Sequence, residues 1–300
     1  MNIEKWIRGN TDSLRGKWVA ISGTTGGLGA ELVRFVAELG GNIVFLNRSE
    51  EKTNVQRLEL LKEFPNAHTK FIKVDMADIN SVLSALEEIK KVPLYAIIHN
   101  AGAYSIKRCK TSIGYDNLFT INFVSPYLLT KSLLPILRER SGRVVIVGSI
   151  AHRYSKTDPK NIDFGNIKAN SLTYGNAKRY LMFSHFELFK EEKKVSLSVA
   201  HPGITFTGIT NHYPKLIFAI IKYPMKIIFE RPKRAALSVL KGLFDSTEHY
   251  FWLGPKLFNI WGLPNKKRLK GVDKNESRFI FSTAENIYKE IKEAFYERAK

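Results

Sequence analysis

The chain has 300 residues, and its 47 Lys and Arg against 28 Asp and Glu give a formal net charge of +19. Apolar residues make up 44%, enough to bury a full core, so a chain disordered throughout is excluded. The single cysteine, Cys109, excludes an intramolecular disulfide scaffold and fits a reducing compartment, and with scattered histidines it gives no zinc-ligand spacing. The charge suits a nucleic acid, an anionic membrane or a phosphate-bearing cofactor as partner, and equally a composition that is simply rich in lysine.

The amino terminus does not have the pattern of a targeting segment. Residues 1–8 are charged and mixed, without the apolar stretch of a signal peptide. The longest run without a charged residue, 195–214, contains two prolines and two glycines and is not expected to cross a membrane. We therefore expect a cytoplasmic protein, either free or peripheral to the inner face of a membrane.

Segments with strand and helix patterns alternate along the chain up to Ala200. Strands are predicted at 17–22, 42–46, 71–74, 94–98, 143–147 and 195–200, and helices at 30–39, 49–64, 79–89, 115–137 and 174–190. Several strands are apolar at every position, as a parallel sheet covered by helices on both faces requires. The sequence thus predicts a doubly wound α/β fold.

Beyond Pro202 the alternation stops, and we expect loops and helices without further strands. The whole chain, 1–300, is expected to be one domain. Residues 15–212 would form the binding and catalytic core, and 213–300 a helical substrate lid with the C-terminal segment.

A glycine-rich turn follows the first predicted strand. Gly23, Gly27 and Gly29 allow the backbone to turn tightly between strand and helix and to approach a ligand closely. The helix that begins there presents free N–H groups and a positive dipole to a diphosphate. The alternative is a loop that merely needs glycine at positive φ.

The end of the second strand is expected to contact the adenosine ribose of a dinucleotide. A carboxylate there favours NAD, and a cation accommodates the 2′-phosphate of NADP. The chain has Asn47-Arg48 and no acid until Glu50. We therefore expect NADP(H), with NAD(H) as the alternative, unless Arg48 is only a solvated loop charge.

Tyr174 and Lys178 are four residues apart in a predicted helix, so they share one face. An ammonium beside a phenol favours the phenolate, which makes Tyr174 a candidate general acid and base. Ser149 directly follows the fifth strand, at the edge where α/β proteins bind ligands. The structural alternatives are a helix N-cap for Ser149 and packing against the sheet for Tyr174.

Together these motifs resemble the short-chain dehydrogenase/reductase family over about residues 17–207. The glycine turn, Asp75-Met76, His99-Asn100-Ala101-Gly102, Asn122, Gly148-Ser149, Tyr174-x-x-x-Lys178 and His201-Pro202-Gly203-Ile204 occur in the family's order. The interval between Ser149 and Tyr174 resembles the branch of retinol dehydrogenases and protochlorophyllide reductase. Ser22 stands in the usual Thr place and His99 in that of an Asn, both at positions that do not react.

The resemblance implies a single-domain Rossmann fold with a built-in active site. It implies a catalytic tetrad of Asn122, Ser149, Tyr174 and Lys178. The cofactor-binding residues that it implies are Gly23, Thr25, Gly27, Leu28, Gly29, Asn47, Arg48, Asp75, Met76, Asn100, Ala101, Gly102, Tyr174, Lys178, Pro202, Gly203, Ile204 and Thr205.

The implied activity is NADP(H)-dependent interconversion of an alcohol with a ketone or aldehyde. In the implied mechanism Tyr174 transfers the proton, Ser149 polarises the substrate oxygen, Lys178 binds the nicotinamide ribose, and Asn122 holds a water. The alternative is a non-catalytic NADP(H) sensor or a membrane-surface module.

The segment after the sixth strand suggests the substrate and the partners. Residues 213–229 are rich in Ile, Leu, Phe and Met, so we expect a hydrophobic small-molecule substrate. Lysines and arginines over 213–234 suit either a lid with a solvated outer face or peripheral membrane contact. The basic run 266–270 lacks interleaved aromatics and is expected to be a solvated loop, so no nucleic-acid partner is expected. The sequence leaves open whether the protein is a monomer or a homodimer.

Overall fold

The computed structural model describes residues 3–203, 230–271 and 273–298. The strands are β1 (Trp18–Ser22), β2 (Asn42–Asn47), β3 (Thr69–Lys73), β4 (Leu94–His99), β5 (Arg143–Val147), β6 (Ser196–Ala200), β7 (Phe251–Leu257) and β8 (Trp261–Arg268). The α-helices are α1 (Ile3–Asn10), α2 (Gly27–Glu38), α3 (Glu50–Glu63), α4 (Ile79–Lys90), α5 (Asn117–Phe119), α6 (Ser125–Arg138), α7 (Asn170–Leu188), α9 (Pro232–Lys241) and α10 (Lys274–Arg298). A π-helical turn, η1 (Thr120–Val124), and a 3₁₀ turn, η2 (Ile150–Arg153), complete the described elements.

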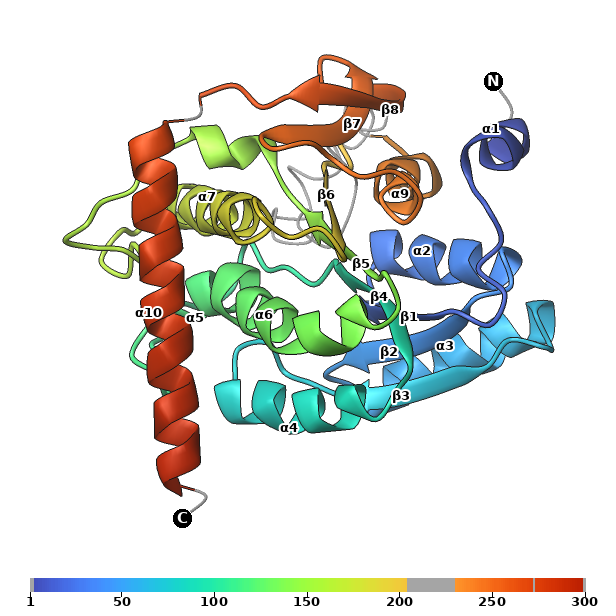
Figure 1. Ribbon diagram of the computed structural model, residues 1–300, viewed down its shortest axis with the longest axis horizontal. Helices are drawn as coiled ribbons and strands as arrows, with labels where there is room; N and C mark the ends of the chain where they lie inside the picture. The colour runs from blue at the N-terminus through green and yellow to red at the C-terminus, as the bar shows by residue number, and fades with distance from the viewer. Residues whose placement is uncertain (1–2, 204–229, 272, 299–300) are drawn as a thin grey trace, which may run out of the picture.

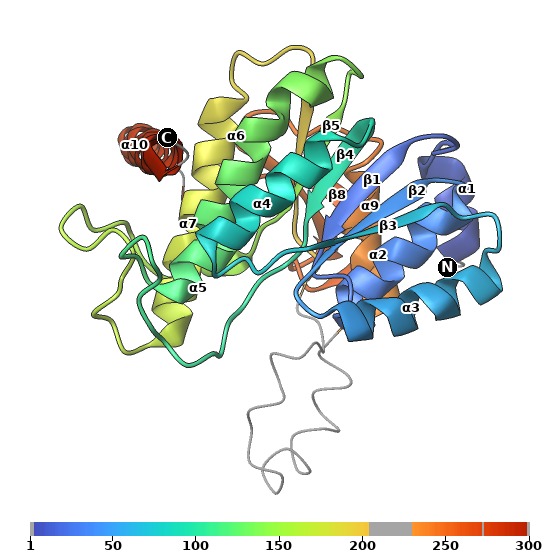
Figure 2. The ribbon, with the colours of Figure 1, turned by 90° about the horizontal axis from the view of Figure 1, so that it is seen from below.

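The described strands form one sheet in the order β3-β2-β1-β4-β5-β6-β7-β8. All neighbours are parallel except β7 and β8. Helices α4, α6 and α7 cover one face, and α2, α3 and α9 cover the other (Figures 1 and 2). The first six strands follow the doubly wound order predicted from the alternating pattern.

Each face of the sheet has its own apolar core. Alternate residues of β1 point to opposite faces, so that Ala20 packs with α4, α6 and α7, while Val19 and Ile21 pack with α2 and α9. All three are completely buried. Burial on both faces explains why the central strands are apolar throughout.

The expectation that no strand follows Pro202 is wrong, because β7 and β8 extend the sheet. β7 pairs with β6 only at Leu253 and Ala200, and with β8 over most of its length. Pro255 and Pro264 interrupt the strand pattern in the sequence, and proline is tolerated at such a sheet margin. The basic run 266–270 was expected to be a loop, but its first three residues belong to β8.

The helix predicted at 115–137 is confirmed over 117–138, but it contains a π-helical turn, because α5 leads directly into η1 and η1 into α6. The π turn inserts an extra residue into the helical register, a feature that often marks functional sites. Asn122, a predicted site residue, lies within it.

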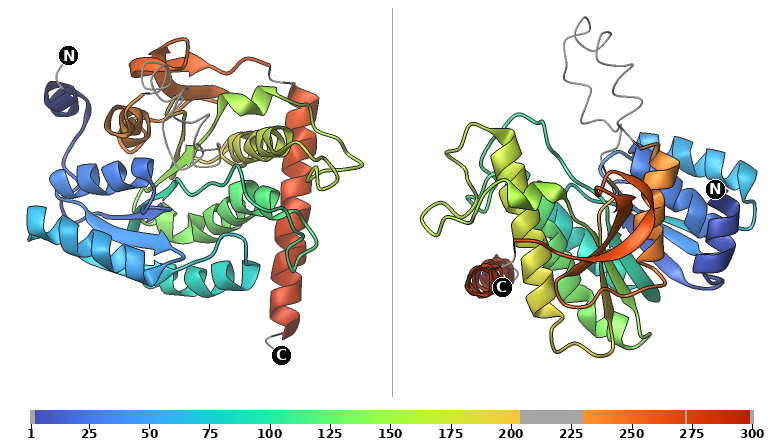
Figure 3. Two further views of the ribbon diagram at one scale, coloured as in Figure 1. Left: turned by 180° about the vertical axis from the view of Figure 1, so that it is seen from behind. Right: turned by 90° about the horizontal axis from the view of Figure 1, so that it is seen from above.

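The long helix α10 crosses the outer side of α7 and α6 (Figure 3). A buried ion pair joins the two helices, since Arg179 of α7 donates from Nε to Glu276 Oε1 over 2.6 Å. Glu276 also accepts from the backbone N and the hydroxyl of Thr157, at 2.8 and 2.9 Å. One carboxylate thus ties α10 to α7 and to the loop that precedes α7.

Candidate active site

A cavity of about 780 Å³ lies at the carboxyl ends of the parallel strands. Its walls include residues at or just after the ends of β1 to β6. Because β1 leads to a helix on one face and β4 to helices on the other, this edge is a topological switch point, where such sheets bind ligands.

Most of the predicted cofactor residues line this cavity. They are Gly23, Thr25, Gly27, Leu28, Gly29, Asn47, Arg48, Asp75, Met76, Asn100, Ala101, Gly102, Tyr174, Lys178 and Pro202. Gly203, Asn122 and Ser149 are not among its lining residues. Ile204, Thr205 and the lid segment 213–229 lie outside the described residues, so the predictions made for them stay predictions.

The glycine turn needs glycine at two positions for steric reasons. Gly23 has φ of +68°, and a Cβ on it would lie 2.8 Å from Ala101 Cα. A Cβ on Gly29 would lie 2.4 Å from Gly23 O. Helix α2 then begins after Gly26 without a side-chain cap and without an acidic residue in its first turn. Its first N–H groups and positive dipole therefore face the cavity edge, as a bound diphosphate would require.

Two polar side chains fasten this turn to the end of β4. The Ser22 hydroxyl accepts from the backbone N–H groups of Asn100 and Ala101, at 3.1 and 2.9 Å. The Asn100 amide donates to the carbonyls of Ser22 and Gly23, at 2.9 and 3.0 Å. Asn100 thus acts mainly as a brace that fixes the turn.

Asn47, at the end of β2, also holds the glycine turn in place through hydrogen bonds. Its Oδ1 accepts from Thr24 N at 2.8 Å, and its Nδ2 donates to the hydroxyls of Thr24 and Thr53 at 2.6 and 2.9 Å. Gln56 completes the network by donating to Thr24 O at 2.8 Å. Sequence reasoning missed Thr24, Thr53 and Gln56, because contacts between the turn and α3, which follows β2, leave no local pattern.

At the β2 end of the cavity the charge is positive and exposed. The side chain of Arg48 is 79% exposed and lies 3.8 Å from Asp75 Oδ2, a long ion pair. Lys52 lines the same end and was also missed. Asp75 uses its other oxygen to accept from Ala77 N at 2.9 Å. The guanidinium of Arg48 is therefore accessible to a ligand.

The opposite end of the cavity holds the predicted catalytic pair. The ring of Tyr174 meets that of Tyr104 edge to face at 5.2 Å between centroids. Burial raises the pKa of Tyr174 to about 12, and the nearby Ser149 hydroxyl only partly opposes this. Ser149 is also the N-cap of η2, since its hydroxyl accepts from Ala151 N at 3.2 Å. The structural and the catalytic interpretations of Ser149 are therefore compatible.

Lys178 is buried beside this tyrosine. Its Nζ lies 5.7 Å from the centre of the Tyr174 ring and donates to Val147 O at 2.9 Å. Burial lowers the pKa of Lys178 to about 8. We expected Lys178 to depress the pKa of Tyr174, but Lys178 does not contribute to the shift in the protein alone, and burial raises the pKa so that the phenol is protonated at neutral pH.

Asn122 approaches the same wall from the π turn. Its Nδ2 donates to the carbonyls of Ala103 and Leu118, both at 2.8 Å, and its buried Oδ1 has no hydrogen-bond partner. A Cβ placed on Gly102 would lie 3.0 Å from this oxygen and 3.7 Å from Lys178 Nζ. The free acceptor and the ammonium thus flank the same glycine, and a water there would satisfy the oxygen.

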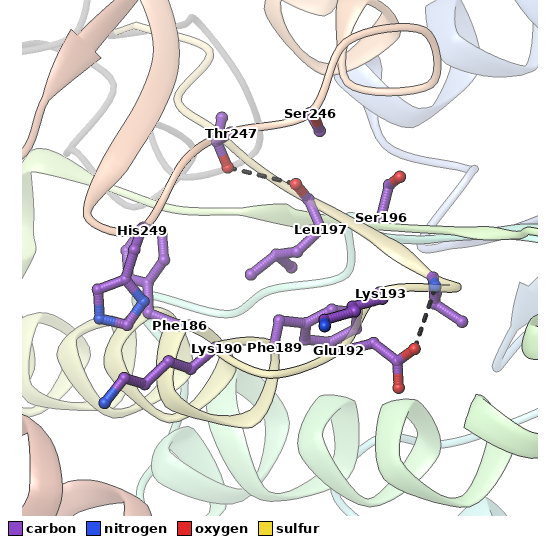
Figure 4. Close-up of a pocket in the computed structure, with 11 residues that line it drawn as sticks. Phe186, Phe189, Lys190, Glu192, Lys193, Ser196, Leu197, Ser246, Thr247 and His249 are labelled. Carbon is purple, nitrogen blue, oxygen red and sulfur yellow. Dashed lines mark hydrogen bonds between the residues drawn. The ribbon is translucent and has the colours of Figure 1, made fainter.

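A second, smaller cavity of about 240 Å³ lies at the amino end of β6 (Figure 4). Phe186, Lys190, Leu197 and His249 are among its lining residues. None of the predicted site residues lines it.

In the described part of the chain no cluster of His, Cys, Asp or Glu could hold a metal ion. No helix in that part is long and apolar enough to span a bilayer.

Comparison with known proteins agrees with this geometry. The family model for short chain dehydrogenases matches residues 17–158, which include the glycine turn, the Asn122 turn and Ser149. Over this stretch the chain is similar to the short-chain dehydrogenase/reductase family, a family of oxidoreductases, as the sequence motifs predicted.

Similar proteins extend the likeness beyond the matched residues. The chain is 26% identical to human polyprenol dehydrogenase over 269 residues, which cover 84% of this chain and 78% of that protein. A putative uncharacterized protein from Mycobacterium paratuberculosis has a similar structure, with a TM-score of 0.74 at 20% identity, covering 94% of this chain and 96% of the other.

An NADPH-dependent 3-quinuclidinone reductase from Rhodotorula rubra shares the fold with a TM-score of 0.60 at 21% identity, covering 77% of this chain and 85% of the other. These likenesses to solved structures establish the doubly wound fold.

Proposed function

We propose that this protein uses NADP(H) to interconvert a ketone or aldehyde and the corresponding alcohol on an apolar substrate. The closeness of Ser149 to the Tyr174 phenol, with Lys178 buried beside that tyrosine at the end of a dinucleotide-sized cavity, carries the proposal. The cavity runs from the exposed guanidinium of Arg48, past the uncapped start of α2, to the Tyr174 phenol. This order matches a ligand with an adenosine phosphate at one end, a diphosphate in the middle and a ring at the other.

When bound, the nicotinamide supplies or accepts the hydride, while the protein supplies position and electrostatics. In reduction Tyr174 donates its phenolic proton to the carbonyl oxygen. The Ser149 hydroxyl donates a hydrogen bond to the same oxygen and stabilises the charge that develops on it. Lys178 binds ribose hydroxyls, and Asn122 Oδ1 holds a water through which the proton is replaced.

The raised pKa of Tyr174 suits the proton-donor role that this residue has in reduction. Because burial raises the pKa of Tyr174 to about 12, the phenol of the protein alone is a proton donor at neutral pH. Oxidation requires the phenolate, and therefore an additional positive charge beside the ring. An oxidised nicotinamide carries such a charge.

The substrate class is supported by the segment 213–229, whose sequence is mainly apolar, and by the name of the human polyprenol dehydrogenase, which indicates a hydrophobic alcohol for that relative. Peripheral membrane contact through 213–234 and the place of the protein in the cell stay predictions.

The test is NADPH oxidation by the purified protein with aldehydes and ketones of increasing chain length. We expect turnover that improves with chain length, and a loss of about 10²- to 10⁴-fold in kcat for Tyr174→Phe, the size of a general-acid contribution. Tyr95→Phe removes a hydroxyl that accepts from Arg143 on β5, outside the cavity lining, and should retain activity. Tight NADPH binding without turnover, unaffected by Tyr174→Phe, would indicate a sensor instead.

A further inference from the structure

The tip of the β7–β8 hairpin exposes two adjacent large apolar side chains. Phe258 is 83% exposed and Leu257 is 54% exposed. In the described chain Phe258 is the most exposed of the large apolar residues. Trp261, only half-buried, pairs with Leu257 across the hairpin. Exposing these apolar side chains to water is unfavourable in free energy, and neighbouring exposed apolar residues often mark an interaction site.

The hairpin tip is held in a fixed shape. Phe258 and Asn259 both have left-handed backbone conformations, with φ of 51° and 59°, which non-glycine residues rarely adopt. Lys267 Nζ bridges the tip by donating to Pro255 O and Lys256 O at 2.8 Å each, and to Asn259 Oδ1 at 3.0 Å. These bonds hold the backbone that carries the two apolar side chains.

Positive charge surrounds the tip. Lys256 is exposed next to Leu257, and Glu230, just before α9, accepts from Gly262 N at 3.4 Å, which places the start of α9 beside the hairpin. Arg231 and Lys233 are exposed there, and no ion pair is found for either within the described residues. Glu230 itself is buried and lies 3.5 Å from Arg234.

These features fit a lipid bilayer better than a second copy of the chain. Two side chains on a convex tip cannot supply the roughly 1,200 Å² that a stable protein interface buries. The net charge of +19 repels another copy and attracts an anionic surface. A fluid bilayer receives apolar side chains from a convex tip, with tryptophan at the interface and lysine at the headgroups.

The hairpin is also connected to the active-site cavity. His201 Nε2 is hydrogen-bonded to Asn259 O at 3.1 Å, and a Cβ on Gly203 would lie 2.7 Å from Ile260 O. Pro202, between these two residues, lines the cavity. The apolar tip therefore lies in the same structural unit as the catalytic end of the cavity.

We propose that the β7–β8 hairpin is a membrane-docking element, which inserts Leu257 and Phe258 into the surface of an anionic bilayer. The inserting residues, Leu257 and Phe258, are not part of the segment 213–234, for which membrane contact was predicted from sequence, although Arg231 and Lys233 of that segment lie beside the hairpin. If the proposed function holds, docking here orients the catalytic end of the cavity toward the bilayer, where an apolar substrate is dissolved.

The test is cosedimentation of the full chain, without cofactor or substrate, with phosphatidylcholine vesicles that contain either no phosphatidylserine or about a third of it. Binding is thus measured independently of any redox activity. The test variant combines Leu257→Ser and Phe258→Ser. The matched control combines Val55→Ser and Leu58→Ser, two exposed apolar residues on α3, at 55% and 63% exposure, with Glu51 and Glu59 nearby in the sequence.

We expect the wild type to bind anionic vesicles and to be released as salt is raised, and the hairpin variant to bind at least tenfold more weakly. The α3 control should bind like the wild type, and equal melting temperatures should show that both variants are folded. Equal vesicle binding by the hairpin variant and the wild type would overturn the proposal, as would absent wild-type binding. A vesicle-free dimer lost only in the hairpin variant would identify a second copy as the partner.

Discussion

Burial acts in opposite directions on the two ionisable groups at the catalytic end of the cavity. It raises the pKa of Tyr174 to about 12 and lowers the pKa of Lys178 to about 8, because it disfavours the charged form of each. The protein alone therefore holds a neutral phenol and, below about pH 8, an ammonium. Proton donation is thus favoured at neutral pH, and Lys178 retains the charge needed to bind hydroxyl oxygens.

Arg48 is the residue for which cofactor choice can be tested. Arg48→Asp replaces an accessible cation by a carboxylate that repels a 2′-phosphate and accepts from a 2′-hydroxyl. Loss of one charge-assisted hydrogen bond, about 1.5–3 kcal/mol, should raise the KM for NADPH by about 10- to 150-fold while activity with NADH improves. Steady-state kinetics with both cofactors measures this.

Arg15→Asp makes the same charge change at another exposed arginine, outside the cavity lining, and should leave the ratio of the two KM values unchanged. If Arg48→Asp also left that ratio unchanged, the residue would be a solvated loop charge and the NADP(H) preference would lack its basis.

At the scale of elements, the glycine turn depends on its neighbours as much as on its own residues. Side chains at the end of β2, in α3 and after β4 all bond to Ser22, Gly23 or Thr24. These bonds occupy backbone groups of the turn, which would otherwise lack partners once buried. The turn is thus held in its shape before any ligand binds.

Helix α10 depends on Glu276 for its attachment to α7. Burial acts to raise the pKa of Glu276, but hydrogen bonds from Arg179 and Thr157 outweigh it and the pKa is lowered. Glu276→Gln leaves Arg179, 5% exposed, without its counter-charge, and should destabilise the protein by about 3–5 kcal/mol. Thermal and urea unfolding measure this loss.

Glu293→Gln on the same helix is the control. Glu293 pairs with Lys289 at 3.8 Å, and both side chains are well exposed, so its loss should change stability by less than about 0.5 kcal/mol. Indistinguishable unfolding of the Glu276 and Glu293 variants would show that the Arg179–Glu276 pair does not hold α10 in place.

At the scale of the whole molecule, a buried polar chain joins β4, α6 and α7. His185 Nδ1 lies 2.7 Å from Leu181 O, an acceptor, so His185 Nε2 accepts from the Thr130 hydroxyl at 3.0 Å. Thr130 in turn accepts from His99 Nε2 at 2.8 Å. This order requires His185 to be neutral, and burial lowers the pKa of both histidines.

Buried histidines should make the fold sensitive to acid. Burial lowers the pKa of His185 and of His201 to about 4 each, against about 6.5 in the unfolded chain. Between these values the unfolded state binds more protons, so stability falls as pH decreases from about 6.5 toward 4. Each histidine should lower the free energy of unfolding by about 2 kcal/mol at pH 5 relative to pH 7.

Urea midpoints at pH 7 and pH 5 measure this difference. His185→Asn removes one titrating group and should reduce the pH-dependent difference, whatever its effect at pH 7. His68→Asn, at an exposed position, should leave the difference unchanged. A difference that does not respond to His185→Asn would place the acid sensitivity elsewhere.

In the structure α10 crosses the outer side of α6 and α7 (Figure 1). A homodimer built through α7 would therefore have to displace α10 or include it in the interface. The choice between monomer and homodimer stays open.

The sequence by itself determined the six parallel strands, the glycine turn and the positions of Tyr174 and Lys178. Each depends on short-range pattern, namely continuous apolar runs, glycines between a strand and a helix, and a four-residue helical spacing. Such patterns can be recognised in the sequence because residues close together in the chain are also close together within one helix or strand.

The tertiary structure alone decided the addition of β7 and β8, the braces of Asn47 and Asn100, the free oxygen of Asn122 and the sign of the pKa shift on Tyr174. These depend on residues far apart in sequence and on how deeply a group is buried. Pairing at the sheet margin stabilises β7 and β8. Their prolines and lysines do not form a strand pattern, so the sequence did not predict them. The Tyr174 pKa follows desolvation, which exists only once the chain has folded around the phenol.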